Sequence, residues 1–266
     1  MTTIARRLQA VNERIASAAR AAGRLPQDVT LVAVSKTFPL CSIFEAYAAG
    51  QRAFGENYLQ EGLEKIRMWA NPDISGRVAQ LQMDDQRPAV DPAPRAFTPQ
   101  AGSPHSLPEW HYIGPIQSNK TRPIAENFSW VHGVEREKIA VRLSEARPEN
   151  LAPLQVCIQV NISGEENKSG VPPEQALDLA MAVSRLPRLR LRGLMAIPEP
   201  ATDASLRQRR FRALRELRDA ITGRGIGMDT LSMGMSDDME SAIAEGATLV
   251  RIGTAIFGAR PLLRPA

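Results

Sequence analysis

Eight short apolar segments, separated by stretches of helical periodicity, run along this chain of 266 residues and constrain its fold more than any other feature. Expected strands lie at 30–35, 52–55, 110–113, 129–132, 154–161, 191–197, 229–233 and 248–252. Helical patterns between them include 135–146, 172–185 and 206–222. Strands separated by helices pair in parallel through right-handed crossovers, and eight such units close on themselves. The sequence therefore predicts an α/β fold, a single (β/α)₈ TIM barrel.

Two segments lie outside this repeat. Apolar residues recur at helical spacing from Ile4 to Ile15, which predicts an extra N-terminal helix that ends by Gly23. Residues 71–108 carry seven prolines and little periodicity. Proline at this density is typical of an extended, flexible insertion. We expect residues 1–266 to form one barrel domain that contains this insertion.

Composition excludes several classes of protein. No apolar run approaches the roughly 18 residues of a membrane span, and the first residues lack a signal-peptide core, so we expect a cytoplasmic protein without membrane contact. Cys41 and Cys157 are too few for a disulfide framework, and the three histidines show no metal-ligand spacing. The net charge is +4, but many arginines share one helix with an apolar stripe, which indicates a solvated face rather than a nucleic-acid site.

A lysine stands at the carboxyl end of the first expected strand, where the apolar run Leu31 to Val34 is followed by Ser35 and Lys36. Only 5 of the 33 Lys and Arg residues are lysine. A lysine in this chain therefore suggests a need for a primary amine. Partial desolvation favours the neutral amine, which attacks aldehydes to form Schiff bases. The alternative is a lysine whose ammonium simply extends to water.

The loops after strands seven and eight lie where barrels of this kind hold phosphate groups. Each combines a glycine, which lets backbone approach a ligand, with hydroxyl side chains. Either loop alone could reflect ordinary turn and cap chemistry, but the two together favour an anion site. The predicted contacts are Ser232, Gly234, Met235, Ser236, Gly253 and Thr254.

Further residues at strand ends complete a candidate cofactor site. Lys36 for an aldehyde, two loops for a phosphate and Arg251 for a ring nitrogen together describe a site for pyridoxal 5′-phosphate. Asn57 follows strand two, and Met195 lies near the end of strand six. Met195 could equally be a packing residue. His111 could be an ordinary strand side chain.

Several motifs resemble the YggS/PROSC family, the pyridoxal phosphate homeostasis proteins. They are Ala33-Val34-Ser35-Lys36-Thr37, Phe54-Gly55-Glu56-Asn57-Tyr58, the segment 110–120, the segment 232–238 and Val250-Arg251-Ile252-Gly253-Thr254. The resemblance implies the barrel of the alanine racemase N-terminal domain, fold type III among pyridoxal phosphate proteins. It also implies that Lys36 is the Schiff-base lysine and that Arg251 faces the pyridine nitrogen. The 71–108 segment departs from the family, whose members usually cross this gap with far fewer residues.

A carrier of the cofactor is the favoured function. A permanently cationic Arg251 leaves a facing pyridine nitrogen unprotonated, which makes the ring a poor electron sink. Racemisation needs acid and base groups on both faces of the substrate, and in alanine racemases a further domain supplies the second one. The chain ends at Ala266 without such a domain, so we expect a monomer that buffers the cofactor and hands it to apo enzymes.

Two alternatives remain at this point. One is an enzyme with weak amino-acid racemase activity, in which Lys36 serves one face and Tyr58 or His111 the other. The other is a phosphate-binding enzyme of sugar metabolism, which would need carboxylate pairs at the strand ends. Glu56 is the only obvious candidate there.

Overall fold

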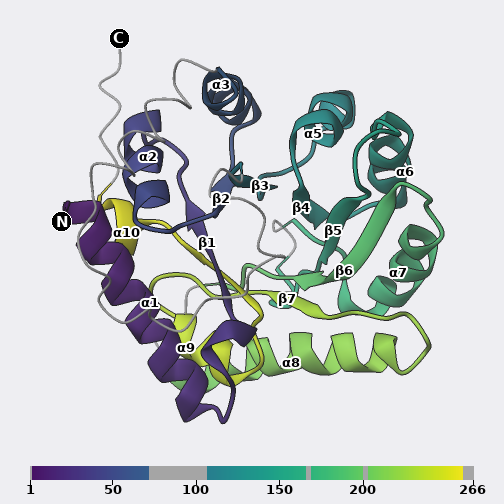
Figure 1. Ribbon diagram of the computed structural model, residues 1–266. Coiled ribbons are helices and arrows are strands. Elements are labelled where there is room, and N and C mark those ends of the chain that lie inside the picture. The colour runs from purple at the N-terminus through teal and green to yellow at the C-terminus, as the bar shows by residue number, and fades with distance from the viewer. Residues whose placement is uncertain (1, 72–106, 166–168, 200–202, 260–266) are drawn as a thin grey trace.

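Eight parallel strands form a closed barrel in the computed structural model, which describes residues 2–71, 107–165, 169–199 and 203–259 (Figure 1). The strands follow one another around the barrel in chain order, and β8 pairs with β1. This arrangement confirms the predicted TIM barrel. The strands are β1 (Thr30–Val34), β2 (Ala53–Glu56), β3 (Glu109–Tyr112), β4 (Trp130–Val134), β5 (Leu154–Gln159), β6 (Leu189–Met195), β7 (Thr230–Ser232) and β8 (Leu249–Ile252).

Helices lie outside this ring of strands. They are α1 (Thr3–Ala21), α2 (Leu40–Ala48), α3 (Leu59–Trp69), α5 (Thr121–Asn127), α6 (Glu137–Ala146), α7 (Ala176–Ser184), α8 (Ala204–Thr222), α9 (Met239–Ala244) and α10 (Thr254–Phe257). Short 3₁₀ turns are η1 (Pro26–Asp28), η2 (Ser118–Lys120) and η3 (Pro173–Gln175). The expected N-terminal helix is α1, which lies beside α9 and α10.

At each strand boundary, the predicted and observed positions differ by no more than two residues. The expected strand 154–161 ends at Gln159, and the expected strand 191–197 runs instead from Leu189 to Met195. The helix expected from 172 begins only at Ala176, because a 3₁₀ turn precedes it. The predicted insertion lies between α3 and β3, and its residues 72–106 are outside the described residues.

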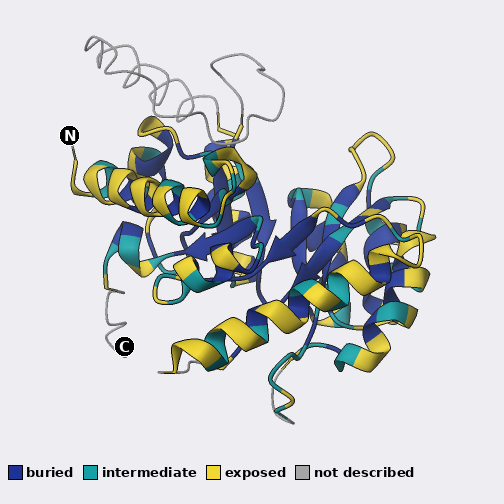
Figure 2. Ribbon diagram, turned by 90° about the horizontal axis from the view of Figure 1, so that it is seen from below, coloured by how far each residue is buried: buried dark blue, intermediate teal, exposed yellow. Residues whose placement is uncertain are grey.

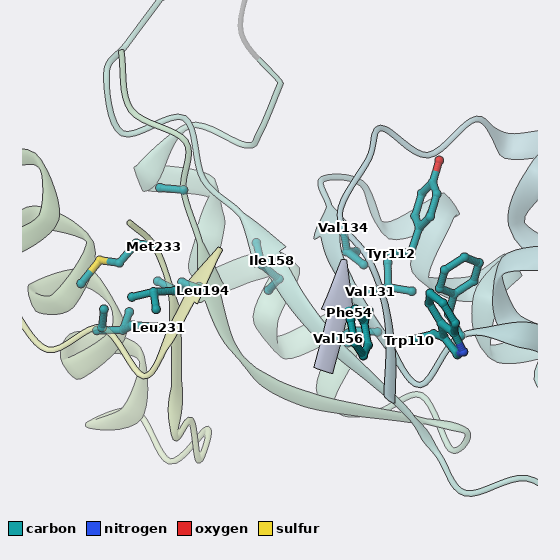
Figure 3. Packing of buried hydrophobic residues seen from close by; sticks show 14 of the residues in the cluster. Phe54, Trp110, Tyr112, Val131, Val134, Val156, Ile158, Leu194, Leu231 and Met233 are labelled. Carbon is teal, nitrogen blue, oxygen red and sulfur yellow. The ribbon is translucent and has the colours of Figure 1, made fainter. Parts of the chain in front are cut away.

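Alternate side chains of each strand face opposite sides of the barrel wall. One set packs against the helices and forms the large hydrophobic core; Figure 3 labels Phe54, Trp110, Val156 and Leu194 among its members. The other set fills the barrel and includes a smaller apolar cluster: Val32, Ala53, Trp130, Cys157, Met195 and Leu249. Polar residues share the inward-facing set, and they position the site described below.

The outer faces of the helices carry most of the exposed residues, as Figure 2 shows around the buried strands. The arginine-rich helix is α8, and its Arg212 and Arg215 both form ion pairs with Glu245 beyond the end of α9. Pairing of this kind agrees with a solvated basic face. Among the described helices, none is long and apolar enough to span a membrane.

Candidate functional site

Lys36 follows β1 at the carboxyl end of the barrel and is half-buried. The backbone before it is fixed to β2, because the Ser35 N–H donates a 3.0 Å hydrogen bond to the Gly55 carbonyl. The turn after β8 approaches the same point: a Cβ on Gly253 would lie 3.2 Å from the Val34 carbonyl oxygen. The barrel therefore brings the start of α10 against the end of β1, two residues before Lys36.

A buried group of charged side chains supports this strand end from outside the barrel. The Lys65 ammonium on α3 lies 2.7 Å from Glu56 Oε1, 2.6 Å from Glu61 Oε1 and 2.8 Å from the Ser35 carbonyl oxygen. The Ser35 hydroxyl also donates to Glu56, at 2.6 Å. We call Ser35, Glu56, Glu61 and Lys65 the acid–lysine cluster. Lys65 is the central residue of this cluster, since it joins α3 to β2 and to the residue that follows β1.

Burial and ion pairing shift the pKa of Glu56 in opposite directions. Burial raises the pKa of its carboxyl above the ordinary value, although Lys65 and Ser35 favour the charged form. Its second oxygen, Oε2, is buried and has no hydrogen-bond partner in the described part of the chain. Lys65 therefore offsets part of the rise that burial causes in the pKa of Glu56.

Thr37, directly after the lysine, adopts a left-handed backbone conformation with φ of 68°. It is the only described residue other than glycine with a positive φ. Such a conformation costs free energy and persists only when the surroundings hold it. Here the Thr37 N–H donates to Glu61 Oε1 at 2.6 Å, so the acid–lysine cluster also fixes the turn that follows Lys36.

The loop after β7 needs a glycine at position 234. Gly234 has φ of 94°, and a Cβ there would lie 2.6 Å from the Cβ of Ala242 on α9. The following N–H, of Met235, donates to Asp238 Oδ1 at 2.6 Å. Asp238 thereby fixes the conformation of the loop. The backbone N–H of Arg251, on the neighbouring strand β8, donates to the Gly234 carbonyl at 2.9 Å.

Arg251 is buried inside the barrel with 4% of its surface exposed. Its guanidinium donates to Ser232 Oγ at 2.6 Å and to the Ala196 carbonyl oxygen at 3.0 Å. Burial lowers the pKa of Arg251 to about 10. The side chain therefore remains cationic at neutral pH, as the sequence analysis expects.

Two histidines extend this contact across the barrel interior. His132 Nδ1 lies 2.7 Å from Ser232 Oγ, and its Nε2 lies 2.9 Å from His111 Nδ1. His111 Nε2 in turn lies 3.3 Å from Glu109 Oε2, at the amino end of β3. We call Glu109, His111, His132, Ser232 and Arg251 the relay. It joins a partly exposed carboxylate to the buried guanidinium.

The charge states in the relay follow from its surroundings. Burial, with His111 and Arg251 nearby, lowers the pKa of His132 well below its ordinary value, so this ring is neutral. Burial raises the pKa of Glu109, but hydrogen bonds from His111 and Trp130 outweigh it and hold that pKa below the ordinary value. Glu109 is therefore a carboxylate at neutral pH.

The structure places the other predicted site residues in different surroundings. Asn57 is half-buried and Tyr58 is 52% exposed, both just before α3. Met195 is fully buried in the apolar cluster inside the barrel, which is the packing role left open by the sequence. Ser236 is half-buried and Thr254 is exposed.

Two placements bear on predicted roles. His111, a candidate catalytic base, is enclosed, and both of its ring nitrogens have partners in the relay. The Ser232 hydroxyl is also enclosed, between Arg251 and His132. Its contact with a phosphate stays a prediction, and its position gives it a second candidate role through Arg251.

Sequence reasoning missed Lys65, His132 and Glu109. Lys65 lies on a helix, where four residues from Glu61 it could equally have formed a surface ion pair. A signal existed for the relay, since its members share the inward-facing parity of their strands. Within the described ranges, no group of three or more His, Cys, Asp or Glu side chains could hold a metal ion.

Comparison with known proteins identifies the family. Residues 7–261 match the family model described as alanine racemase, N-terminal domain. The pyridoxal phosphate homeostasis protein of Pseudomonas aeruginosa is 53% identical over 266 residues, which is 100% of each chain. The chain belongs to this family. The pyridoxal phosphate homeostasis protein of Escherichia coli is 48% identical over 263 residues, 98% of each chain.

A solved structure of a relative carries a ligand. PipY of Synechococcus elongatus, solved with PLP bound, is 32% identical and superposes with a TM-score of 0.69. The match covers 96% of this chain and 100% of that one. The resemblance stated from the sequence motifs is thereby confirmed at the level of family and fold.

Proposed function

We propose that this chain binds pyridoxal 5′-phosphate through Lys36 and acts in the cytoplasm as a carrier and buffer of that cofactor. The observation that carries the proposal is the approach of the β8–α10 turn to the end of β1, where Gly253 lies against Val34, two residues before Lys36. An aldehyde-reactive amine and a candidate phosphate loop thus share one edge of the barrel. The PLP-bound structure of PipY supports the same ligand.

The residues present fit the three recognisable groups of this cofactor. Lys36 offers the amine, and the loops at 232–236 and 253–254 offer backbone N–H groups and hydroxyls for a phosphate. Arg251 offers a buried cation for the ring nitrogen. When bound, the cofactor supplies an aldehyde that condenses with amines.

Each side chain has a defined task. The neutral amine of Lys36 adds to the aldehyde carbon and water leaves, which gives a Schiff base. The acid–lysine cluster holds the backbone on either side of Lys36 through Ser35 and Thr37. Arg251 keeps its proton at neutral pH and so does not pass one to the ring nitrogen.

These tasks favour storage over turnover. An unprotonated pyridine ring is a weak electron sink, so carbanion chemistry at the site is poorly supported. His111 has both ring nitrogens engaged in the relay, which disfavours it as the second base of a racemase. We propose that the protein works as a monomer and that apo enzymes dependent on pyridoxal phosphate are its recipients.

The first experiment locates the attachment. Borohydride reduction of the loaded protein followed by peptide mapping should place the pyridoxyl group on Lys36. Lys36→Ala should fold and lack the covalent adduct. Lys138→Ala, on the exposed face of α6, serves as the matched control and should keep it. Labelling of a different lysine would contradict the site.

The second experiment separates carrier from enzyme. The loaded protein should restore the activity of an apo enzyme that requires pyridoxal phosphate. Incubation with L-alanine, L-serine or L-glutamate should leave optical rotation and keto-acid content unchanged. Turnover faster than about 1 s⁻¹, the low end of ordinary enzymes, would favour the racemase alternative instead.

A further inference from the structure

The carboxylate end of the relay fixes the direction of every hydrogen bond in it when both imidazoles are neutral. Arg251 has only donors, and the Glu109 carboxylate has only acceptor oxygens. In the part of the chain that the structure describes, Ser232 Oγ has two hydrogen-bond partners, Arg251 and His132. Arg251 can only donate, so Ser232 Oγ accepts from it. A hydroxyl oxygen can accept twice, so the direction of the Ser232–His132 contact is set from the Glu109 end.

The histidine tautomers follow from the Glu109 carboxylate, which can only accept. His132 is neutral and accepts at Nδ1, so its proton is on Nε2 and is donated to His111 Nδ1. His111 accepts there and donates from Nε2 to Glu109. The order is forced from the carboxylate: Glu109 accepts from His111 Nε2, so a neutral His111 accepts at Nδ1, and a neutral His132 accepts at its own Nδ1 from the Ser232 hydroxyl. The whole relay donates one way, from the guanidinium to the carboxylate.

A second contact determines which Glu109 oxygen serves the relay. The Trp130 indole N–H, which can only donate, lies 3.1 Å from Glu109 Oε1 and leaves Oε2 for His111. The His111 ring also stacks on Trp130, with centroids 5.4 Å apart and planes 10° from parallel. Both contacts fix the plane of the first imidazole and therefore the aim of its Nδ1.

We propose that Glu109, His111 and His132 are positioning residues for the cofactor ring: through Ser232 they hold the Arg251 guanidinium in the orientation that faces the pyridine nitrogen. This inference rests on the proposed function for its ligand. Its hydrogen-bond direction is a property of the protein alone. No contact between the cofactor and Glu109 or either histidine is required.

The sharpest test changes one atom at the far end of the relay. In Glu109→Gln the amide oxygen must stay with Trp130, so the amide nitrogen faces His111 and donates to it. Both histidines should then carry their proton on Nδ1, whereas in the unchanged protein both carry it on Nε2. Nitrogen-15 NMR of histidine-labelled protein without cofactor distinguishes the two patterns.

A matched control makes the same substitution elsewhere. Glu240→Gln removes a carboxylate on α9 that pairs with Arg14, and both histidines should keep the proton on Nε2. The relay assignment is overturned if His111 and His132 of the wild-type protein carry their protons on Nδ1. It is equally overturned if Glu109→Gln leaves both tautomers as they were.

A binding experiment tests the effect on the cofactor. His132→Phe removes the acceptor of the Ser232 hydroxyl and should weaken retention of pyridoxal phosphate and of pyridoxal alike, each by about five- to tenfold. Equal losses are expected because Arg251 faces the ring, which both ligands share. Cys157→Ala, a change in the same barrel interior outside the relay, should leave both affinities within about twofold.

The outcomes separate this inference from the proposed function. Unchanged affinity in His132→Phe, or a loss confined to pyridoxal phosphate, would overturn the positioning role even though the cofactor binds. If the wild-type protein does not bind pyridoxal phosphate, the proposed function is overturned, and so is the role of the relay in positioning Arg251 against the cofactor ring. The tautomer pattern would still be measured independently in that case.

Discussion

The acid–lysine cluster outside β1 and β2 is built from ion pairs, whereas the relay inside the barrel has the neutral ring of His132 at its middle. The cluster places the Lys65 ammonium 2.7 Å from Glu56 and 2.6 Å from Glu61, and it contacts the residues on either side of Lys36. The relay places two imidazole rings and a hydroxyl between Glu109 and Arg251. One network therefore holds the backbone of a site residue, and the other holds a side chain.

The two networks stabilise the protein by different amounts. Removing one partner of a buried ion pair leaves an uncompensated charge and costs about 3–5 kcal/mol. Losing one neutral hydrogen bond costs about 1–3 kcal/mol when a buried group is left unsatisfied. We therefore expect the cluster to dominate stability near Lys36 and the relay to act mainly on ligand orientation.

The largest effect should follow from Lys65→Met. The change nearly keeps the length of the side chain but leaves the buried Glu56 carboxylate without the Lys65 ammonium. The free energy of unfolding should therefore fall by about 3–5 kcal/mol at neutral pH. Denaturant unfolding measures this loss. Lys138→Met on the exposed side of α6 is the control and should stay within about 0.5 kcal/mol. A loss that small for Lys65→Met would remove the distinction between the two networks.

The pH dependence of the stability loss in Lys65→Met gives a second test of the Lys65–Glu56 ion pair. Lys65 lowers the Glu56 pKa, which burial already raises, so its removal raises that pKa further. A carboxyl whose pKa is higher folded than unfolded destabilises the fold above the unfolded value, and the penalty grows until the folded pKa is passed. The destabilisation should therefore be larger at pH 8 than at pH 5. Equal losses at both pH values would contradict this account.

An intermediate effect is expected from His132→Phe. An aromatic ring is kept, but the Ser232 hydroxyl loses its acceptor, so stability should fall by about 1–3 kcal/mol. The networks share no residue, so the double variant with Lys65→Met should be additive within about 0.5 kcal/mol. A larger coupling energy would show that the barrel wall transmits strain between them.

Ligand selectivity should separate the phosphate loop from the relay. A hydrogen bond to a charged acceptor contributes about 1.5–3 kcal/mol, so Thr254→Val should weaken retention of pyridoxal phosphate about tenfold and leave pyridoxal nearly unchanged. Ser232→Ala discriminates between the two roles of that hydroxyl. A loss for both ligands indicates action through Arg251, and a loss for pyridoxal phosphate alone indicates phosphate contact.

The smallest effect should come from shortening the proline-rich segment. Its sequence has few periodic apolar residues, and loop-closure entropy depends weakly on length. Joining Ala70 to Glu109 through a short flexible linker should change neither solubility nor cofactor retention by more than about twofold. Loss of soluble protein would instead assign this segment a part in the fold.

Periodicity alone predicted the barrel, because strand and helix repeats are local properties of the chain. The positions of Lys36, Arg251 and the two glycine-containing loops followed from strand ends, since parallel strands of a barrel open at one face. Lys65 could not be found in this way. Its burial depends on how α3 packs against β1 and β2, which no local pattern states.

The sequence by itself determined eight strand–helix units, one lysine at the end of the first strand, one arginine in the last strand and the family motifs around them. Only the tertiary structure decided which polar side chains meet. His111 and His132 are 21 residues apart and His132 and Ser232 are 100 apart, yet each pair is in hydrogen-bond contact. The physical reason is that strand order around the barrel and inward parity together set these distances, and a buried polar group gains stability only from the partner that closure brings to it.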